Sequence, residues 1–171
     1  MGRNEKIISK SNLWRFDLLM ILVLLGTQNN SFHRLLEEIQ KMIDEKIINE
    51  KVVVQAGYTQ FKSKDMEIFD LIPLDRIEKL QEEANLIITH GGVGSIISSN
   101  NKGKKVIAIP RLHEYGEHVN NHQKEIVKSF SDKGCIIRSQ RCTRLKRSIY
   151  KKQRLYTKKI RKWYKKYIKN Y

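Results

Sequence analysis

The stretch Asn85–Gln123, NLIITHGGVGSIISSNNKGKKVIAIPRLHEYGEHVNNHQ, decides the fold that we expect for this chain. It opens with an apolar run, Leu86–Ile88, whose length and branching are typical of a buried parallel strand. The glycine-rich segment His90–Ser95 follows at once, and a short helix is predicted over Ile96–Lys102. Val106–Ile109 then has the composition of a second buried strand. Strand, glycine turn, helix and strand, in this order, predict one unit of an α/β protein.

The glycine turn is the first candidate for a ligand site. Three of the four residues in Gly91–Gly94 are glycines, so the backbone can turn sharply and a ligand can approach its amides closely. The turn opens the predicted helix, and backbone N–H groups at a helix N-terminus favour an anion such as phosphate. Glycine turns also occur for packing alone, and GGVGS matches neither GxGxxG nor a Walker A loop. Both interpretations stay open at this point.

The rest of the chain alternates between strand and helix patterns. Further strands are expected over Ile21–Leu25, Lys51–Gln55, Met66–Ile72 and Cys135–Ile137. Further helices are expected over Ser31–Lys46, Arg76–Ala84 and Val119–Lys133, with Ser31 and Asp75 as N-caps and Gly103 and Gly134 as closing glycines. This alternation predicts an α/β fold, a Rossmann-like parallel sheet with helices on both faces. Ligands of such sheets bind beyond the carboxyl ends of the strands, where both glycine turns would lie.

The charge of the chain is concentrated at its C-terminal end. The formal net charge is +16, from 34 Lys or Arg and 18 Asp or Glu. Residues 138–171 hold fifteen of the basic residues and no acidic one, so residues 1–137 hold 19 and 18, a balance of +1. We therefore divide the chain into an N-terminal extension (1–19), a near-neutral body (20–137) and a basic tail (138–171).

The two ends of the chain allow more than one interpretation. The tail places aromatic residues among its lysines and arginines, so it is either a basic helix for an anionic membrane or nucleic acid, or the product of a shifted reading frame. Met20 stands directly before the first strand, so the chain starts at Met1 or at Met20. The longest apolar run, Leu18–Leu25, is much shorter than the ~20 residues of a membrane span and lacks a signal-peptide cleavage pattern. Cys135 and Cys142 have no metal or redox spacing, so we expect a reduced, cytoplasmic protein.

Four motifs in order give the chain a family resemblance: THGGVGS, GKKVIAIPR, GEH and HQ. Over about Ile21–Ile137 the chain resembles the C-terminal, donor-binding domain of family 28 glycosyltransferases. It is most similar to small bacterial capsular and exopolysaccharide subunits, and more distantly to the catalytic subunit of the two-part N-acetylglucosaminyltransferase of the dolichol pathway. The resemblance implies the C-terminal half of a GT-B glycosyltransferase, with 20–137 as the donor-binding domain.

This resemblance implies an activity and a partner. A UDP-sugar would be the donor, and the hexose would pass to a lipid-linked acceptor in capsular or exopolysaccharide biosynthesis. The acceptor would be held by a separate, membrane-anchored subunit, because 171 residues do not contain two such domains. This chain would then lie at the inner face of the membrane through its partner. The sugar remains open among galactose, glucose and N-acetylglucosamine.

The resemblance also implies the residues of the site. The donor-binding candidates are Gly26, Thr27, Gly91, Gly92, Gly94, Ser95, Glu117, His122 and Gln123. Ser98 stands near the position where several relatives carry a ribose-binding glutamate. The catalytic base is not identified; His90 and Glu117 are weak candidates, and a histidine at the position of His90 is more often a hydrogen-bonded structural residue. Arg111 either meets phosphate or pairs with Glu117 on the surface.

We expect no cofactor and no metal, because no aspartate pair stands where a metal would bridge the donor phosphates. Two other functions remain as alternatives. The charge of +16 is compatible with an α/β module that binds nucleic acid or a membrane surface, although the near-neutral body argues against nucleic acid as a partner. Ser98 and the tail are also compatible with an inactive remnant of the enzyme.

Overall fold

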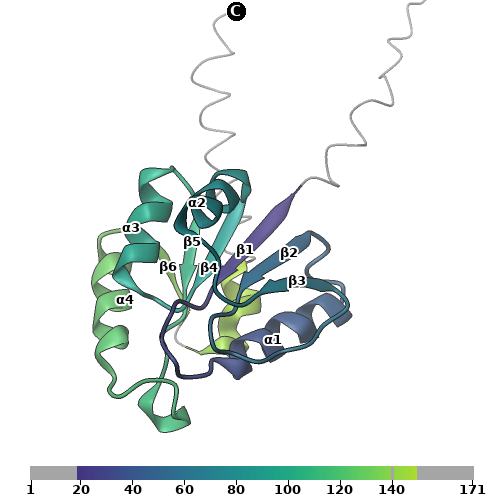
Figure 1. Cartoon of the computed structure of the whole chain (residues 1–171). Helices are drawn as coiled ribbons and strands as arrows, with labels where there is room; N and C mark the ends of the chain where they lie inside the picture. Colours follow the sequence, from purple (N-terminus) through teal and green to yellow (C-terminus); the bar gives the residue numbers. More distant parts are fainter. Residues whose placement is uncertain (1–18, 140, 150–171) are drawn as a thin grey trace, which may run out of the picture.

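The computed structural model describes residues 19–139 and 141–149, which form a six-stranded sheet covered by helices (Figure 1). All paired strands run parallel, in the order β3-β2-β1-β4-β5-β6. They are β1 (Met20–Leu24), β2 (Lys51–Gln55), β3 (Met66–Phe69), β4 (Leu86–Thr89), β5 (Val106–Ala108) and β6 (Ile137–Arg138). The predicted parallel sheet is confirmed. The predicted extension, apart from residue 19, and the aromatic part of the predicted tail lie outside the described residues.

The central strands are buried on both faces because they carry apolar side chains at consecutive positions. All five residues of β1, MILVL, are buried. Ile21 and Val23 point into one apolar core, whereas Leu22 and Leu24 point into the other. A strand that is apolar at every position therefore lies in the middle of a parallel sheet, between two layers of helices.

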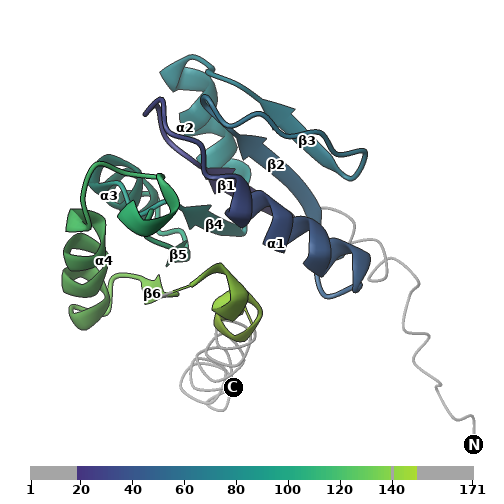
Figure 2. The same ribbon diagram turned by 90° about the horizontal axis from the view of Figure 1, so that it is seen from below.

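The helices divide between the two faces of the sheet, as Figure 2 shows from below. Helix α1 (His33–Asp44) and the 3₁₀ turn η3 (Cys142–Arg144) cover one face. The other face is covered by α2 (Leu74–Glu83), α3 (Val93–Asn101) and α4 (His122–Asp132). Helices on both faces were predicted, and this arrangement confirms them. Within the described residues, no helix has the length and apolar character needed to cross a membrane.

The starts of the helices differ from the local prediction. Phe32, rather than Ser31, occupies the N-cap of α1, and no side chain caps that end. The ring of Phe32 is fully buried and its backbone N–H donates to the Thr59 hydroxyl at 2.9 Å, so a tertiary contact replaces the cap. The predicted N-cap Asp75 is also wrong, because α2 begins at Leu74, one residue earlier. Asp75 instead lies in the first turn, where its charge suits the helix dipole.

The ends of the helices agree better with the sequence. Gly103 and Gly134 follow the C-caps of α3 and α4 with φ of 67° and 73°, which confirms both closing glycines. Helix α4, however, begins at His122 and not at Val119. The chain between β5 and α4 forms the short turn η2 (His113–Tyr115) and an irregular loop.

The packed core continues past Ile137, where the sequence places the end of the body. Cys142, Leu145 and Ile149 are buried in the same apolar cluster as the inner face of α1. Their spacing of three and four residues is helical, so one face of the basic segment is apolar. The first part of the predicted tail therefore belongs to the folded domain.

The strand order places a topological switch point between β1 and β4. After β1 the chain builds β2 and β3 on one side, then crosses back to place β4 on the other. The turns that follow β1 and β4 therefore diverge from neighbouring strand ends, which is the usual ligand position in open α/β sheets. Leu24 and Thr89 are register partners, so the two glycine turns begin side by side.

Candidate functional site

The turn after β1 is held by the strand beside it. Gly26 has a φ of 79°, which favours glycine. Its N–H donates to Oε1 of Gln55 at 3.2 Å, and its carbonyl accepts from Nε2 of Gln55 at 3.0 Å. Thr27 follows in the same turn and is exposed. The backbone of this turn is thus fixed, with Thr27 open to solvent at the carboxyl edge of the sheet.

His90 fills the space between the two glycine turns. A Cβ atom at Gly26 would lie 2.6 Å from Cε1 of His90, and one at Gly92 would lie 2.4 Å from its Nε2. The ring Nδ1–H donates to the Leu24 carbonyl at 3.1 Å. Burial, together with the nearby charges of Arg111 and His118, lowers the pKa of His90 to about 4, against the raising effect of the Leu24 bond. His90 is therefore a neutral, hydrogen-bonded wedge at neutral pH.

The glycines of the second turn have different surroundings. Gly91, with a φ of 89°, packs against Val127 of α4, where a Cβ would approach the methyl group to 2.5 Å. Gly92 is the N-cap of α3, and no side chain caps that end. Gly94 is exposed in the first turn of α3, and nothing lies within 4 Å of a Cβ built there. Packing thus explains the first two glycines, whereas Gly94 borders open space.

The N-terminus of α3 is a site suited to an anion. The first amides of a helix lack acceptors within the helix, and the dipole adds positive potential. Here they belong to Val93, Gly94 and Ser95, at the switch point of the sheet. Ser98 lies one turn further along, and its hydroxyl donates to Oε1 of Gln81 in α2 at 2.8 Å. The predicted phosphate residues therefore lie together, and Ser98 is used to join α3 to α2.

Arg111, in the loop after β5, has neither of its predicted roles. Its side chain is 1% exposed and donates to three backbone carbonyls. These belong to Leu25 at 2.8 Å, Asn30 at 2.5 Å and Glu117 at 3.2 Å. Burial lowers the pKa of Arg111 to about 10, so it stays charged at neutral pH. Because it is enclosed, it neither meets phosphate directly nor forms a surface pair with the Glu117 carboxylate.

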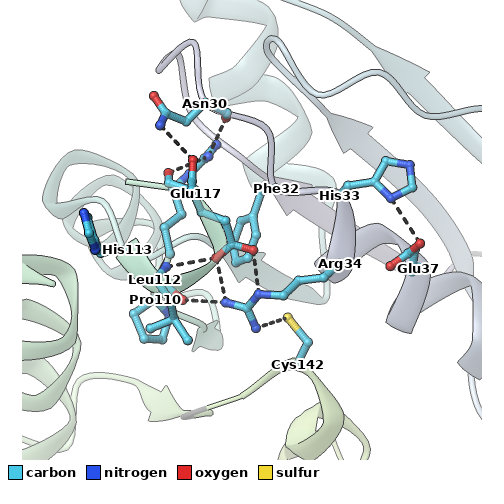
Figure 3. A network of polar contacts seen from close by, with 12 residues as sticks. Asn30, Phe32, His33, Arg34, Glu37, Pro110, Leu112, His113, Glu117 and Cys142 are labelled. Carbon is cyan, nitrogen blue, oxygen red and sulfur yellow. Dashed lines mark hydrogen bonds and ion pairs between the residues drawn. The ribbon is translucent and has the colours of Figure 1, made fainter. Parts of the chain in front are cut away.

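The Glu117 carboxylate is instead held by Arg34 of α1 (Figure 3). Arg34 Nε and Nη2 donate to the two carboxylate oxygens at 2.5 and 2.7 Å, and the Leu112 N–H donates to Oε2 at 2.9 Å. Glu117 is 4% exposed. A carboxylate with these partners is not available as a base or a sugar ligand in this conformation. The sequence gives one weak signal for a special role of Arg34: it is a basic residue at the position, three residues after Ser31, where a capping box would have an acid.

The histidine–glutamine pair at the start of α4 divides between surface and interior. His122 is exposed, and its Nδ1 lies 3.3 Å from Oε2 of Glu125. Gln123 is buried, and its Oε1 accepts from the Arg111 N–H at 3.0 Å. His118, just before α4, contacts Gln28 in the turn after β1, with 3.3 Å between the two Nε2 atoms. His118 thus lies in the loop beside the turn after β1 and His122 is exposed at the start of α4, whereas Gln123 shapes the loop.

Solved structures share this fold. The glycotransferase of kitacinnamycin matches with a TM-score of 0.61 at 18% identity, over 80% of this chain and 35% of that chain. MurG of Acinetobacter baumannii matches with a TM-score of 0.55 at 16% identity, over 80% of this chain and 41% of that chain. The predicted half of a GT-B glycosyltransferase is therefore confirmed as the fold.

Sequence comparison gives a nearer relative and a family. UDP-N-acetylglucosamine transferase subunit ALG13 of Candida albicans is 36% identical over 75 residues, which are 44% of this chain and 24% of that protein. The match thus spans about a quarter of the relative. The glycosyltransferase family 28 C-terminal domain matches residues 20–167, a range that continues past Ile137. The chain belongs to the glycosyltransferase family 28 C-terminal domain family.

Proposed function

We propose that this chain is the donor-binding subunit of a glycosyltransferase that uses a UDP-sugar. The hexose is transferred to a lipid-linked acceptor, held by a membrane-anchored partner subunit, in capsular or exopolysaccharide biosynthesis. Family membership and the likeness to a UDP-N-acetylglucosamine transferase subunit support this proposal. The observation that carries it is the open, uncapped N-terminus of α3 at the switch point, where Gly94 borders empty space.

The donor diphosphate lies, in this proposal, against the first amides of α3 and beside the Gly26–Thr27 turn. These amides and the helix dipole then stabilise the charge that develops on the UDP leaving group as the glycosidic bond breaks. They do so without a metal or another cofactor, as the sequence leads us to expect. His118, on the loop beside the turn, and His122, at the start of α4, are the candidates for contacts to the sugar.

The acceptor and its base come from the partner. His90 is enclosed and its Nδ1–H donates to the Leu24 carbonyl, and Glu117 is bound to Arg34, so neither weak candidate is poised to deprotonate an acceptor hydroxyl. Large apolar side chains are exposed on segments that follow strands: Leu74 at the start of α2, and Tyr115 and Val119 in the loop after β5. They support a partner surface at the carboxyl edge. The same partner would hold this chain at the cytoplasmic face of the membrane.

The donor site is tested by calorimetric titration with UDP, UDP-glucose, UDP-galactose and UDP-N-acetylglucosamine. We expect Gly94→Leu to weaken UDP binding at least about tenfold, since the new side chain fills the space over the first amides. Asn101→Leu, at the exposed far end of α3, is the matched control and should bind as the original chain does. Absence of UDP binding at millimolar concentration by the folded chain would overturn the proposal.

The split enzyme is tested by mixing. The purified chain is assayed alone and with the membrane fraction that contains its presumed partner, using a lipid-linked acceptor. We expect activity only on mixing, because positioning of the acceptor hydroxyl contributes several orders of magnitude in rate. Full turnover by the single chain would contradict the split. UDP binding without turnover, even with the partner, would favour the inactive remnant.

The charge of +16 favours one rival, a module that binds nucleic acid or an anionic membrane surface. Such binding should weaken steeply with salt and vanish when the basic residues beyond Ile149 are removed. A deletion after Ile137 is unsuitable, because it removes Cys142, Leu145 and Ile149 from the core. Donor binding that survives the deletion after Ile149 separates the two functions.

A further inference from the structure

The loops after β1 and β5 are tied together across the end of β4, which lies between these strands in the sheet. Besides the buried Arg111, two contacts join them. Asn30 Nδ2 donates to the Gly116 carbonyl at 3.0 Å, and Gln28 meets His118 at 3.3 Å. The Arg34–Glu117 pair reinforces this tie from α1. We use the name clamp for Arg34 together with the loop 112–118, which contains its partner Glu117.

Arg34 is the centre of the clamp. Besides the two bonds to Glu117, its Nη2 donates to the Pro110 carbonyl at 3.3 Å and its Nη1 donates to Cys142 Sγ at 3.0 Å (Figure 3). Its guanidinium also lies over the ring of Tyr115, 4.7 Å from the centroid. Burial acts to lower the pKa of Arg34, but the hydrogen bond and charge of Glu117 raise it overall. One side chain thus joins α1, the loop after β5 and the segment after β6.

The geometry of these contacts requires arginine. Nε and Nη2 form a parallel pair of bonds to one carboxylate, and the remaining Nη1 bonds a third element. Lysine carries the same charge but has one nitrogen, so it cannot make these contacts together. Glu117 in turn holds the Leu112 N–H at 2.9 Å, which fixes the first residue of the loop. The position of the loop therefore depends on the shape of Arg34 as well as on its charge.

We propose that Arg34 is a positioning residue that acts through Glu117. It holds the loop bearing His118 against the turn after β1, and so sets the binding of the part of the donor that reaches this loop. The inference rests on the proposed function and gives Glu117 a supporting role in place of a ligand contact. The diphosphate site at α3 is built from other residues, so the two parts of the donor should respond separately to changes at Arg34.

The test compares Arg34→Met, Arg34→Lys and the double variant Arg34→Met/Glu117→Leu. The double variant replaces a buried pair by apolar groups, which proteins often tolerate, so it keeps the test readable if Arg34→Met does not fold. Lys51→Met is the matched control, because Lys51 pairs with Glu67 at 2.6 Å on the exposed surface at the opposite end of β2. Each variant is titrated with UDP and with the UDP-sugar that the original chain binds best.

For Arg34→Met or the double variant, we expect the ratio of the UDP-sugar Kd to the UDP Kd to rise about tenfold. The UDP Kd itself should change less than about threefold. Compared with Arg34→Met, Arg34→Lys should be more stable, but its ratio of Kd values should stay close to that of Arg34→Met. An unchanged ratio in a folded variant, or an equal loss for UDP and UDP-sugar, would overturn the positioning role.

A second measurement needs no ligand. The Gly116 and Glu117 amides donate to the His113 and Leu112 carbonyls at 2.9 and 3.2 Å inside the loop. Hydrogen exchange at these amides should accelerate about tenfold in the double variant, with the β1 amides unchanged. Unchanged protection of the loop would overturn the clamp even if donor binding is normal. Absence of UDP binding by the original chain, with the exchange result as expected, would remove the proposed function but leave the clamp.

Discussion

The carboxyl edge of the sheet has two parts that are built in different ways. The turns after β1 and β4 consist of backbone, shaped by glycines and by His90 between them. The loop after β5 is shaped by side chains from distant elements. Arg34 contacts Glu117, which is 83 residues away in the sequence, and also contacts Cys142, which is 108 residues away. The glycines that shape the first part are a local signal in the sequence, whereas the second part depends on charged side chains that pair across the fold. A single substitution should therefore act very differently in the two parts.

The largest effect is expected in the turn after β1. Gly26→Val places a branched side chain at a φ of 79° and drives its Cβ to within 2.6 Å of the His90 ring. Backbone strain and overpacking together should destabilise the fold by about 4 kcal/mol. Urea unfolding measures this loss. A change below about 1 kcal/mol would show that the turn adapts, and that His90 is not a fixed wedge.

The segment that supports the loop after β5 should be nearly as sensitive to substitution. Leu145 is fully buried against α1 in the segment after β6, so Leu145→Ala should cost about 3 kcal/mol. Thr143→Ala, on the exposed surface of the same segment, is the control and should be nearly neutral. Equal and small effects of the two changes would mean that the segment beyond Ile137 is not part of the core.

Much of the first part follows from the sequence because its determinants are neighbours in the chain. The apolar runs, the glycines that close α3 and α4 and the turn His90–Ser95 are local signals, and the sheet that they predict is the one observed. Gly91 is buried against Val127 at a φ of 89°, whereas Gly94 is exposed in the first turn of α3 with nothing within 4 Å of a Cβ built there. A motif thus locates the site, but it does not show which glycine leaves room for a ligand.

The second part could not be predicted in the same way. Arg111 and Glu117 are close in the sequence and oppositely charged, so a surface pair between them is the simplest expectation. In the fold, Glu117 meets Arg34 instead, and Arg111 is enclosed among carbonyls. The partner of a charged side chain depends on which helix crosses the loop. No local pattern gives that information.

Acid should lower the stability of the turns after β1 and β4 through His90. Its pKa of about 4 in the fold lies below the ordinary value of 6.5, so the unfolded chain binds the proton more readily. The stability that this gives is complete above pH 6.5 and is lost as the pH falls toward 4, by about 3 kcal/mol in total. His90→Asn keeps a donor for the Leu24 carbonyl but cannot titrate. Urea unfolding at pH 7 and pH 4.5 should show a smaller acid loss in the variant; an equal loss would contradict the assignment.

The smallest effect on stability is expected at Gly94, and it separates ligand space from packing. Gly94 lies in the first turn of α3 with nothing within 4 Å of its would-be Cβ, so Gly94→Ala is free of the clashes that affect Gly26 and Gly92. Removing a helical glycine should raise stability by about 0.5–1 kcal/mol, because alanine loses less backbone entropy. UDP binding should fall at the same time, since the added methyl group stands where the diphosphate would approach. Thermal unfolding and UDP titration of one sample measure both effects. A more stable variant with unchanged UDP affinity would place the ligand elsewhere, whereas a destabilised one would mean that the space beside Gly94 is filled by the protein itself.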